Sequence, residues 1–264
     1  MPDRSFHFPD LGLALGAARQ AAEAADRIAM AYFRSSGLAV ERKSDASPVT
    51  IADRECETAI RKTLQAQFPD HAFFGEEYGQ QGDSRCLWLI DPIDGTRSFI
   101  RGLPFWSVQI ALMVDGELVL GVSSAPAFGE TAWAVSDGSA MIDGQAVTTG
   151  TTGQIEQADI SFGNLRSLAR SSGWHAVGQL VARAARCRGY GDFYSYHRLA
   201  DGGQDAVVES DVNILDIAAL TVICRQAGAR VTDLAGGPIN LDTTSILAAA
   251  PMLHDQLLEL FNDR

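Results

Sequence analysis

A continuous apolar run at residues 87–90 (LWLI) ends directly in the segment DPIDGT at residues 91–96. A short, uninterrupted apolar run of this kind is typical of a strand that is buried on both faces. Two carboxylates, a proline and a glycine then follow at the point where this strand ends. The feature therefore predicts a fully buried strand with an acidic turn at its end, and the fold must accommodate both.

The composition of the chain predicts a folded protein with a large core. Its 264 residues are 46% hydrophobic and 20% charged, which fits one large domain or two modest ones and does not fit a disordered chain. With 33 acidic and 21 basic residues the net charge is −12, which argues against binding of nucleic acid or an anionic membrane. A small anionic substrate stays possible, because a bound metal reverses the charge of a local site.

The expected location is the cytoplasm. The four cysteines have no C-x-x-C spacing, so they predict buried reduced thiols rather than a zinc site or a disulfide framework. The N-terminal segment lacks the features of a signal peptide and continues as an amphipathic helix, with Asp10 as its N-cap. No apolar run approaches the roughly 20 residues that span a bilayer. These features predict a soluble protein.

The first half of the chain predicts an α+β arrangement with an antiparallel sheet. Helices are expected at about 10–34 and after residue 50, followed by strands at 71–75 and 86–90 and by a hairpin that turns at Asp115-Gly116. The second half alternates strands with helices, including a helix over 174–186, and predicts an α/β arrangement. The Gly-, Thr- and Gln-rich stretch at 140–157 suggests a division into 1–145 and 146–264.

Asp91 and Asp94 are candidate ligands of Mg²⁺, which prefers carboxylate oxygens in octahedral geometry. The strand end fixes Asp91, and the carbonyl of Ile93 is a further possible ligand. Gly95 lets the backbone approach a ligand, and Thr96 adds a hydroxyl and an N–H suited to a phosphate. The same residue types also favour an ordinary turn, so this segment alone leaves both interpretations open.

Three other acidic features each have a simple structural explanation. The pair Glu76-Glu77 after a short strand is compatible with a solvated loop. Asp53 stands three residues after Thr50, which fits a helix capping box. Asp216 falls in the first turn of an apolar helix, where an acid complements the helix dipole.

Taken in order, these features resemble the inositol monophosphatase-like family of Mg²⁺-dependent, lithium-sensitive phosphatases. That family carries an Asp near a helix start, then G-E-E, then D-P-[IL]-D-G-[TS], then W-D-x-A. This chain has Asp53, GEE at 75–77, DPIDGT at 91–96 and LDIAA at 215–219. The resemblance runs over nearly the whole chain. Leu215 stands where the family usually has Trp, which puts a packing contact in doubt rather than the neighbouring Asp216.

The resemblance implies a layered αβαβα sandwich of the inositol monophosphatase and fructose-1,6-bisphosphatase type, two to three Mg²⁺ ions and a homodimer. It also implies roles for single residues. The metal ligands would be Glu76, Asp91, the Ile93 carbonyl, Asp94 and Asp216; Glu76 and Thr96 would orient the attacking water, with Asp53 behind them; Asp94, Gly95 and Thr96 would contact the substrate phosphate. The expected activity is hydrolysis of a small phosphorylated metabolite.

The second half suggests which ester is hydrolysed. Where the inositol enzymes typically have a G-[ST]-[AC]-A run, this chain has YGDFYSY at 190–196, which looks like the histidinol-phosphatase branch. Histidinol phosphate carries an ammonium group and an imidazole, which Asp192 and Glu209 could pair with. The alternative role of Asp192 is that of a helix N-cap, and Arg188 is either a pocket residue or a surface base.

The leading prediction is therefore a Mg²⁺-dependent histidinol-phosphatase of histidine biosynthesis. The alternative enzyme is an inositol-1-monophosphatase or a broad-specificity sugar phosphatase. A catalytically silent, metal-binding regulatory protein is the alternative of another class, and the complete set of acids argues against it.

Overall fold

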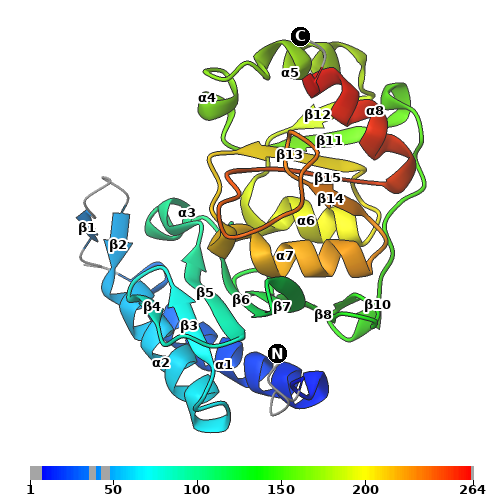
Figure 1. Cartoon of the computed structure of the whole chain (residues 1–264). Helices are drawn as coiled ribbons and strands as arrows, with labels where there is room; N and C mark the ends of the chain where they lie inside the picture. Colours follow the sequence, from blue (N-terminus) through cyan, green and yellow to red (C-terminus); the bar gives the residue numbers. More distant parts are fainter. Residues whose placement is uncertain (1–7, 36–39, 43–47, 263–264) are drawn as a thin grey trace.

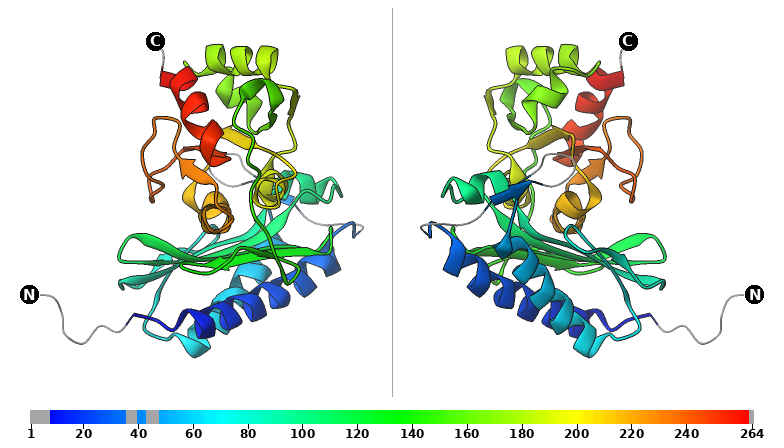
Figure 2. Two further views of the ribbon diagram at one scale, coloured as in Figure 1. Left: turned by 90° about the vertical axis from the view of Figure 1, so that its right-hand side faces the viewer. Right: turned by 90° about the vertical axis from the view of Figure 1, so that its left-hand side faces the viewer.

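The computed structural model describes residues 8–35, 40–42 and 48–262, which form five layers (Figures 1 and 2). Two long helices cover one face of a large sheet, two helices cover its other face, a smaller sheet follows, and short helices cover that sheet (Figure 2). The predicted αβαβα sandwich is confirmed.

The first layer consists of α1 (Leu11–Tyr32) and α2 (Ile51–Gln67), which pack against each other and against the large sheet. The buried face of α1 consists of seven alanines, whose small side chains allow close packing. As predicted, the Asp10 carboxylate accepts hydrogen bonds from the N–H groups of Gly12 and Leu13 and caps the helix. Short strands β1 (Val40–Arg42) and β2 (Pro48–Thr50) pair just before α2.

The large sheet has eight strands in the order β10-β9-β8-β7-β6-β5-β3-β4. Its pairs are antiparallel except for β3 and β5, which run parallel, so the prediction of an antiparallel sheet is wrong at this one pair. That exception follows from the chain path, because the β4 hairpin lies between the two strands in sequence and returns the chain to the same end. The strands are β3 (Ala72–Gly75), β4 (Gly79–Gln81), β5 (Cys86–Asp94), β6 (Ser107–Val114), β7 (Glu117–Ala125), β8 (Glu130–Val135), β9 (Met141–Ile142) and β10 (Gln145–Ala146).

The central layer consists of α6 (Asp192–Ala200) and α7 (Ile214–Gln226), which lie between the two sheets (Figure 1). Ten of the thirteen residues of α7 are buried, because one side of the helix packs on the large sheet and the other on the small one. A helix that is apolar on all sides needs such a position. This packing is so close that a Cβ on Gly121 of β7 would lie 2.4 Å from the Ala219 carbonyl oxygen.

The small sheet has the order β12-β11-β13-β15-β14, and its pairs are parallel among β12, β11 and β13 and antiparallel at β15. Helices α4, α5 and α8 lie on the side of the small sheet that faces away from α7 (Figure 1). The bounds are η1 (Ile155–Gln157), β11 (Asp159–Phe162), α4 (Leu165–Leu168), α5 (Trp174–Arg183), β12 (Arg186–Arg188), β13 (Ala206–Ser210), β14 (Arg230–Thr232), β15 (Ser245–Ala249) and α8 (Pro251–Asn262).

Most predicted elements are present, and the differences are short strands and the short helix α4, which was not predicted. The helix expected over 174–186 ends at Arg183, because Arg186 begins β12 at the edge of the small sheet. Strand β4 was not predicted, since GQQ carries no apolar pattern and is held only by pairing with β3. The cysteines are all free, as predicted, although Cys187 is only half-buried. Among the described residues, no helix is both long and apolar enough to cross a membrane.

Asp26 of α1 predicts a pH dependence of stability away from the candidate site. Its carboxylate accepts a hydrogen bond from Ser124 Oγ on β7 at 2.6 Å, and burial raises its pKa from 3.8 to about 6. The folded state therefore binds a proton more tightly than the unfolded state does. The stability contributed by this proton is fully present below about pH 4 and is lost as the pH rises through about 6.

The variant Asp26→Asn is expected to remove this decrease of stability with rising pH. Between pH 4.5 and 7.5 the free energy of unfolding of the wild type should fall relative to that of the variant by about 1–3 kcal/mol. Urea unfolding at both pH values measures the difference. Asp83→Asn, in the exposed loop just before β5, is the matched control, because it removes a carboxylate that does not act on Asp26. Parallel pH profiles for Asp26→Asn and the wild type would contradict the prediction.

Candidate active site

The acidic turn at the end of β5 is rigid. A register shift against β6 lies between Asp91 and Asp94, and the N–H of Ile93 donates to the Asp91 carboxylate at 3.0 Å. Gly95 has a left-handed backbone (φ 85°), and a Cβ at this position would lie 2.6 Å from the Phe105 carbonyl oxygen. A glycine is therefore required here, both for the conformation and for the close approach of the backbone.

Three carboxylates from distant parts of the chain meet at this turn. Oxygens of Asp91, Asp94 and Asp216 all lie within 4.8 Å of one another. Asp216 reaches the turn from the first turn of α7, where it also completes a capping box with Asn213. Asp216 therefore has both of its expected roles, because one carboxylate can interact with the start of its helix and also face the cavity.

The electrostatics of the cluster favour a bound cation. Burial raises the pKa of both Asp91 and Asp94 well above the usual value, and the surrounding carboxylates add to the effect. The pKa of Asp216 is raised to about 6, again mainly by burial. Such a group of acids repels itself when ionised, and a divalent cation compensates that repulsion. The all-oxygen donor set fits a hard ion such as Mg²⁺.

Glu76 stands beside the same cluster, on the turn between β3 and β4. It lines a cavity of about 450 Å³ together with Asp91, Asp94 and Asp216. Its charge is among the causes that raise the pKa of Asp91. Because β3 pairs parallel with β5, the strand end that carries Glu76 lies next to the one that carries Asp91.

Thr96 and Asp53 connect the turn to the start of α2. The Thr96 hydroxyl lies 3.0 Å from the Ile93 carbonyl oxygen and 3.4 Å from the Asp53 carboxylate, so either can accept its proton. Asp53 is buried and also accepts from the N–H and the hydroxyl of Thr50, which confirms the predicted capping box. Burial raises the pKa of Asp53 above its usual value. Gly95, Thr96 and Ile93 line the cavity with Glu76.

Two further acids lie in a recess that adjoins the cavity. Asp192, at the start of α6, and Glu209, on β13, share a small recess with Asp94 and Asp216. Burial raises the pKa of Asp192 to about 6 and that of Glu209 to about 8. Among the described residues, no N–H group donates a hydrogen bond to the Asp192 carboxylate, so the alternative capping role has no support there.

Tyr196 and Asn164 line this recess and were not predicted. The Tyr196 hydroxyl donates to the Glu209 carboxylate at 2.6 Å. The i, i+4 spacing of a helix could have identified Tyr196, since it stands four residues after Asp192 and therefore on the same helix face. Asn164 follows the end of β11, as Glu76 follows the end of β3, so its place after a strand was the signal that could have found it.

Arg188 and Leu215 complete the predicted residues. Arg188 lies exposed on β12, and its guanidinium donates to the neighbouring Cys187 carbonyl; it is not among the residues that line the cavity. Leu215 is buried in the apolar cluster between the sheets, so the contact that a tryptophan would make is replaced by aliphatic packing.

The sequence as a whole matches one family. The profile of the inositol monophosphatase family covers residues 13–264. This chain belongs to that family. A histidinol-phosphatase from Mycobacterium tuberculosis is 36% identical over 96% of this chain and 98% of its own length. A histidinol-phosphatase from Chlorobaculum parvum is 37% identical over 91% and 92%, respectively.

Solved structures agree with this placement in the inositol monophosphatase family. The extragenic suppressor protein suhB from Bartonella henselae superposes with a TM-score of 0.88 at 28% identity, over 95% of this chain and 99% of that one. An inositol monophosphatase from Zymomonas mobilis gives a TM-score of 0.86 at 30% identity, over 97% and 100%. These relatives share the whole five-layer fold rather than one part of it.

Proposed function

We propose that this member of the inositol monophosphatase family hydrolyses L-histidinol phosphate to L-histidinol and phosphate, with Mg²⁺ as cofactor. The observation that carries the proposal is the acidic cavity in which Asp91, Asp94 and Asp216 converge and Asp192 and Glu209 line the adjoining recess. The histidinol-phosphatases of 36–37% identity over nearly the full length support the choice of substrate.

Five residues would hold two to three Mg²⁺ ions: Glu76, Asp91, Ile93 through its carbonyl, Asp94 and Asp216. When bound, the ions lower the pKa of water and neutralise the phosphoryl oxygens. The protein contributes the geometry, because Asp91 and Asp94 are fixed by the irregular end of β5 and Asp216 by the capping box of α7. Such positioning is the main requirement of phosphoryl transfer.

Thr96 and Glu76 would orient the attacking water. The Thr96 hydroxyl can donate to Asp53 or to the Ile93 carbonyl, which leaves its oxygen lone pairs free to accept a proton of the water. Asp53, anchored by Thr50, acts as a positioning residue behind Thr96. The N–H groups of Gly95 and Thr96 would receive the phosphate at the start of α3 (Thr96–Ile100).

Asp192 and Glu209 suit a substrate with cationic groups. Both carboxyls have raised pKa values because burial disfavours their charged forms. An ammonium or imidazolium group placed between them would favour ionisation and gain a charge-assisted hydrogen bond. Tyr196 would hold Glu209 in place through its hydroxyl. A substrate role for Arg188 stays a prediction, and its exposed position on β12 gives it no support.

The remaining expectations are part of the same proposal. We propose that residues 1–145 supply the main metal site and that residues 146–264 add Asp216 and the substrate contacts. A homodimer in the cytoplasm, acting in histidine biosynthesis, completes the proposal; sedimentation of the purified protein tests the dimer.

Release of phosphate by the purified protein tests the function. Histidinol phosphate, inositol 1-phosphate, fructose 1,6-bisphosphate and adenosine 3′,5′-bisphosphate should be compared with Mg²⁺ present, and histidinol phosphate should have the highest kcat/KM. A preference for inositol 1-phosphate would support the alternative enzyme. That alternative is included because a fructose-1,6-bisphosphatase/inositol-1-monophosphatase from Thermotoga maritima is 31% identical to this chain. No release from any ester would favour a silent, metal-binding protein.

The variant Asp192→Asn should discriminate between substrates. Loss of one charge-assisted hydrogen bond to the substrate cation costs about 1.5–3 kcal/mol of binding free energy. KM for histidinol phosphate is therefore expected to rise about 10–100-fold. KM for inositol 1-phosphate, which has no cationic group, is the internal control and should change much less. Equal increases for both esters would assign Asp192 a purely structural role.

A further inference from the structure

A buried ion pair on α2 lies directly behind the turn that carries Glu76. Glu57 is fully buried, and Arg61, one helical turn later, is 8% exposed. Arg61 Nε donates to Glu57 Oε1 at 2.7 Å. Neither residue is among those that line the acidic cavity, so the pair acts on the site from outside the cavity.

Both peptide groups that flank Glu76 are held by hydrogen bonds. The N–H of Glu76 donates to the carbonyl of Ile90, the residue just before Asp91, at 3.2 Å. The N–H of Glu77 donates to Glu57 Oε2 at 2.6 Å. Because planar peptide groups on both sides fix the backbone at Glu76, these two bonds set the direction of its Cα–Cβ bond.

Gly75, at the first end of this turn, makes room for the ion pair. A Cβ on Gly75 would lie 2.0 Å from Glu57 Oε1, so only glycine leaves space for the buried carboxylate. Gly75 is paired with Gly79 where β3 meets β4. Arg61 Nη2 donates to the Gly79 carbonyl at 2.6 Å. Glu57 therefore holds the first end of the turn and Arg61 the second.

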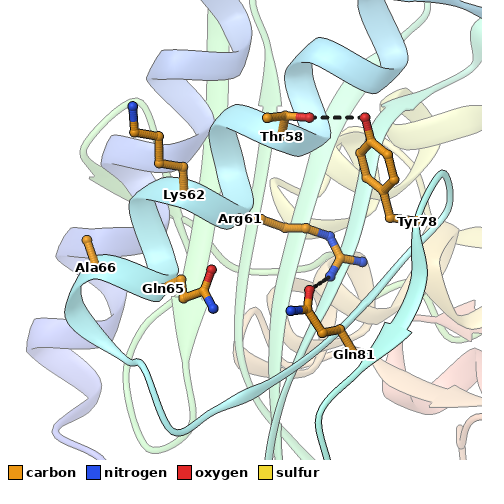
Figure 3. Close-up of a pocket in the computed structure, with 7 residues that line it drawn as sticks. All are labelled: Thr58, Arg61, Lys62, Gln65, Ala66, Tyr78 and Gln81. Atoms are coloured by element: carbon orange, nitrogen blue, oxygen red, sulfur yellow. Dashed lines mark hydrogen bonds between the residues drawn. The ribbon is translucent and has the colours of Figure 1, made fainter.

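Arg61 extends this contact along the hairpin. Figure 3 shows its side chain reaching from α2 across to β4, where Nη1 donates to Gln81 Oε1 at 3.4 Å. Burying an ion pair costs desolvation and is a weak source of stability by itself. Here, however, the two side chains make four hydrogen bonds, one with each other and three with the β3–β4 hairpin. The geometry of these bonds is suited to positioning the turn that carries Glu76.

We propose that the Glu57–Arg61 pair positions Glu76 for metal binding and thereby sets the metal affinity of the site. The inference rests on the proposed function, because it takes Glu76 as a metal ligand. Groups that orient a metal ligand from behind typically change metal affinity by 10–100-fold when they are altered. In Glu57→Gln the amide oxygen can still accept from Glu77, but the charge that holds Arg61 is gone.

Binding of Mn²⁺ to the whole protein, followed by the electron paramagnetic resonance signal of the free ion, tests the proposal without turnover. Glu57→Gln is expected to weaken Mn²⁺ binding about 10-fold and to raise the Mg²⁺ concentration for half-maximal phosphate release by a similar factor. KM for the ester at saturating Mg²⁺ should change less than about twofold. Glu55→Gln is the matched control, since Glu55 is exposed on the same helix and, within the described part of the chain, accepts a hydrogen bond only from Tyr32.

A second variant keeps the test decisive if Glu57→Gln does not fold. Arg61→Lys keeps the charge next to Glu57 but cannot bond Gly79 and Gln81 as the guanidinium does, so it should weaken Mn²⁺ binding by a smaller factor. Variants that unfold at lower temperature but bind Mn²⁺ like the wild type when folded would overturn the positioning role. A wild type that binds Mn²⁺ but hydrolyses no ester would refute the proposed function alone, and one that binds no Mn²⁺ would overturn both.

Discussion

Asp91→Asn is expected to lower kcat/KM for phosphate release at least 10³-fold, which corresponds to about 4 kcal/mol of lost transition-state stabilisation. Asp91 stands at the centre of the acid cluster, where burial and the charges of Glu76, Asp94 and Asp216 all raise its pKa. An amide has nearly the same shape but no charge, so the cluster loses one of the three carboxylates whose oxygens converge there. Steady-state kinetics over a range of Mg²⁺ concentrations measure the effect.

The fold should survive this substitution. Without metal, the variant removes one member of a group of mutually repelling acids, so its midpoint of thermal unfolding should equal or exceed that of the wild type. Asp83→Asn, in the exposed loop just before β5, is the matched control and should leave kinetics and unfolding unchanged. Retained turnover in folded Asp91→Asn would rule out Asp91 as an essential ligand.

Removal of divalent metal is expected to abolish phosphate release completely and to lower stability. Metal that binds only the folded state stabilises it by about 2.7 kcal/mol at a concentration 100-fold above Kd. Addition of Mg²⁺ after chelation should therefore restore activity and raise the temperature of unfolding together. Full activity after exhaustive chelation would contradict a metal-dependent mechanism.

The stabilisation by Mg²⁺ should also depend on pH. Metal binds the ionised carboxylates, and the pKa of Asp216 in the metal-free protein is about 6. The rise in unfolding temperature on adding Mg²⁺ should be larger at pH 8 than at pH 5, because protons compete for the same oxygens at the lower pH. Unfolding scans with and without Mg²⁺ at both pH values measure the difference. An equal rise at both would mean that the ion binds elsewhere.

The local chemistry of the site was accessible from short segments of sequence. The run at 87–90 predicted the buried strand β5, and the spacing of Thr50 and Asp53 predicted the capping box of α2. Hydrophobic pattern and capping residues act within a few positions of one another, so such features need no knowledge of the fold. The order of the four acidic motifs then predicted the family and with it the layers.

Features that depend on pairing between distant strands were predicted less well. The parallel alignment of β3 and β5 was missed, although it is what places Glu76 next to Asp91. Strand β12 was not predicted, because its three residues carry no periodic pattern, and its first residue, Arg186, was assigned to the preceding helix. The Glu57–Arg61 pair was not singled out from the sequence, where it has only the i, i+4 spacing of an ordinary helical salt bridge. The position of the β3–β4 turn reveals that both residues bond its backbone.

The sequence by itself determined the buried strand, the acidic turn at its end, the helix caps and the membership of the family. Tertiary structure alone decided which acids share one cavity and which residues hold them. Asp91 and Asp216 are separated by 125 positions along the chain (216 − 91), and no local pattern links them. They meet because α7 is apolar on all sides and packs between the two sheets, which brings its first turn to the end of β5.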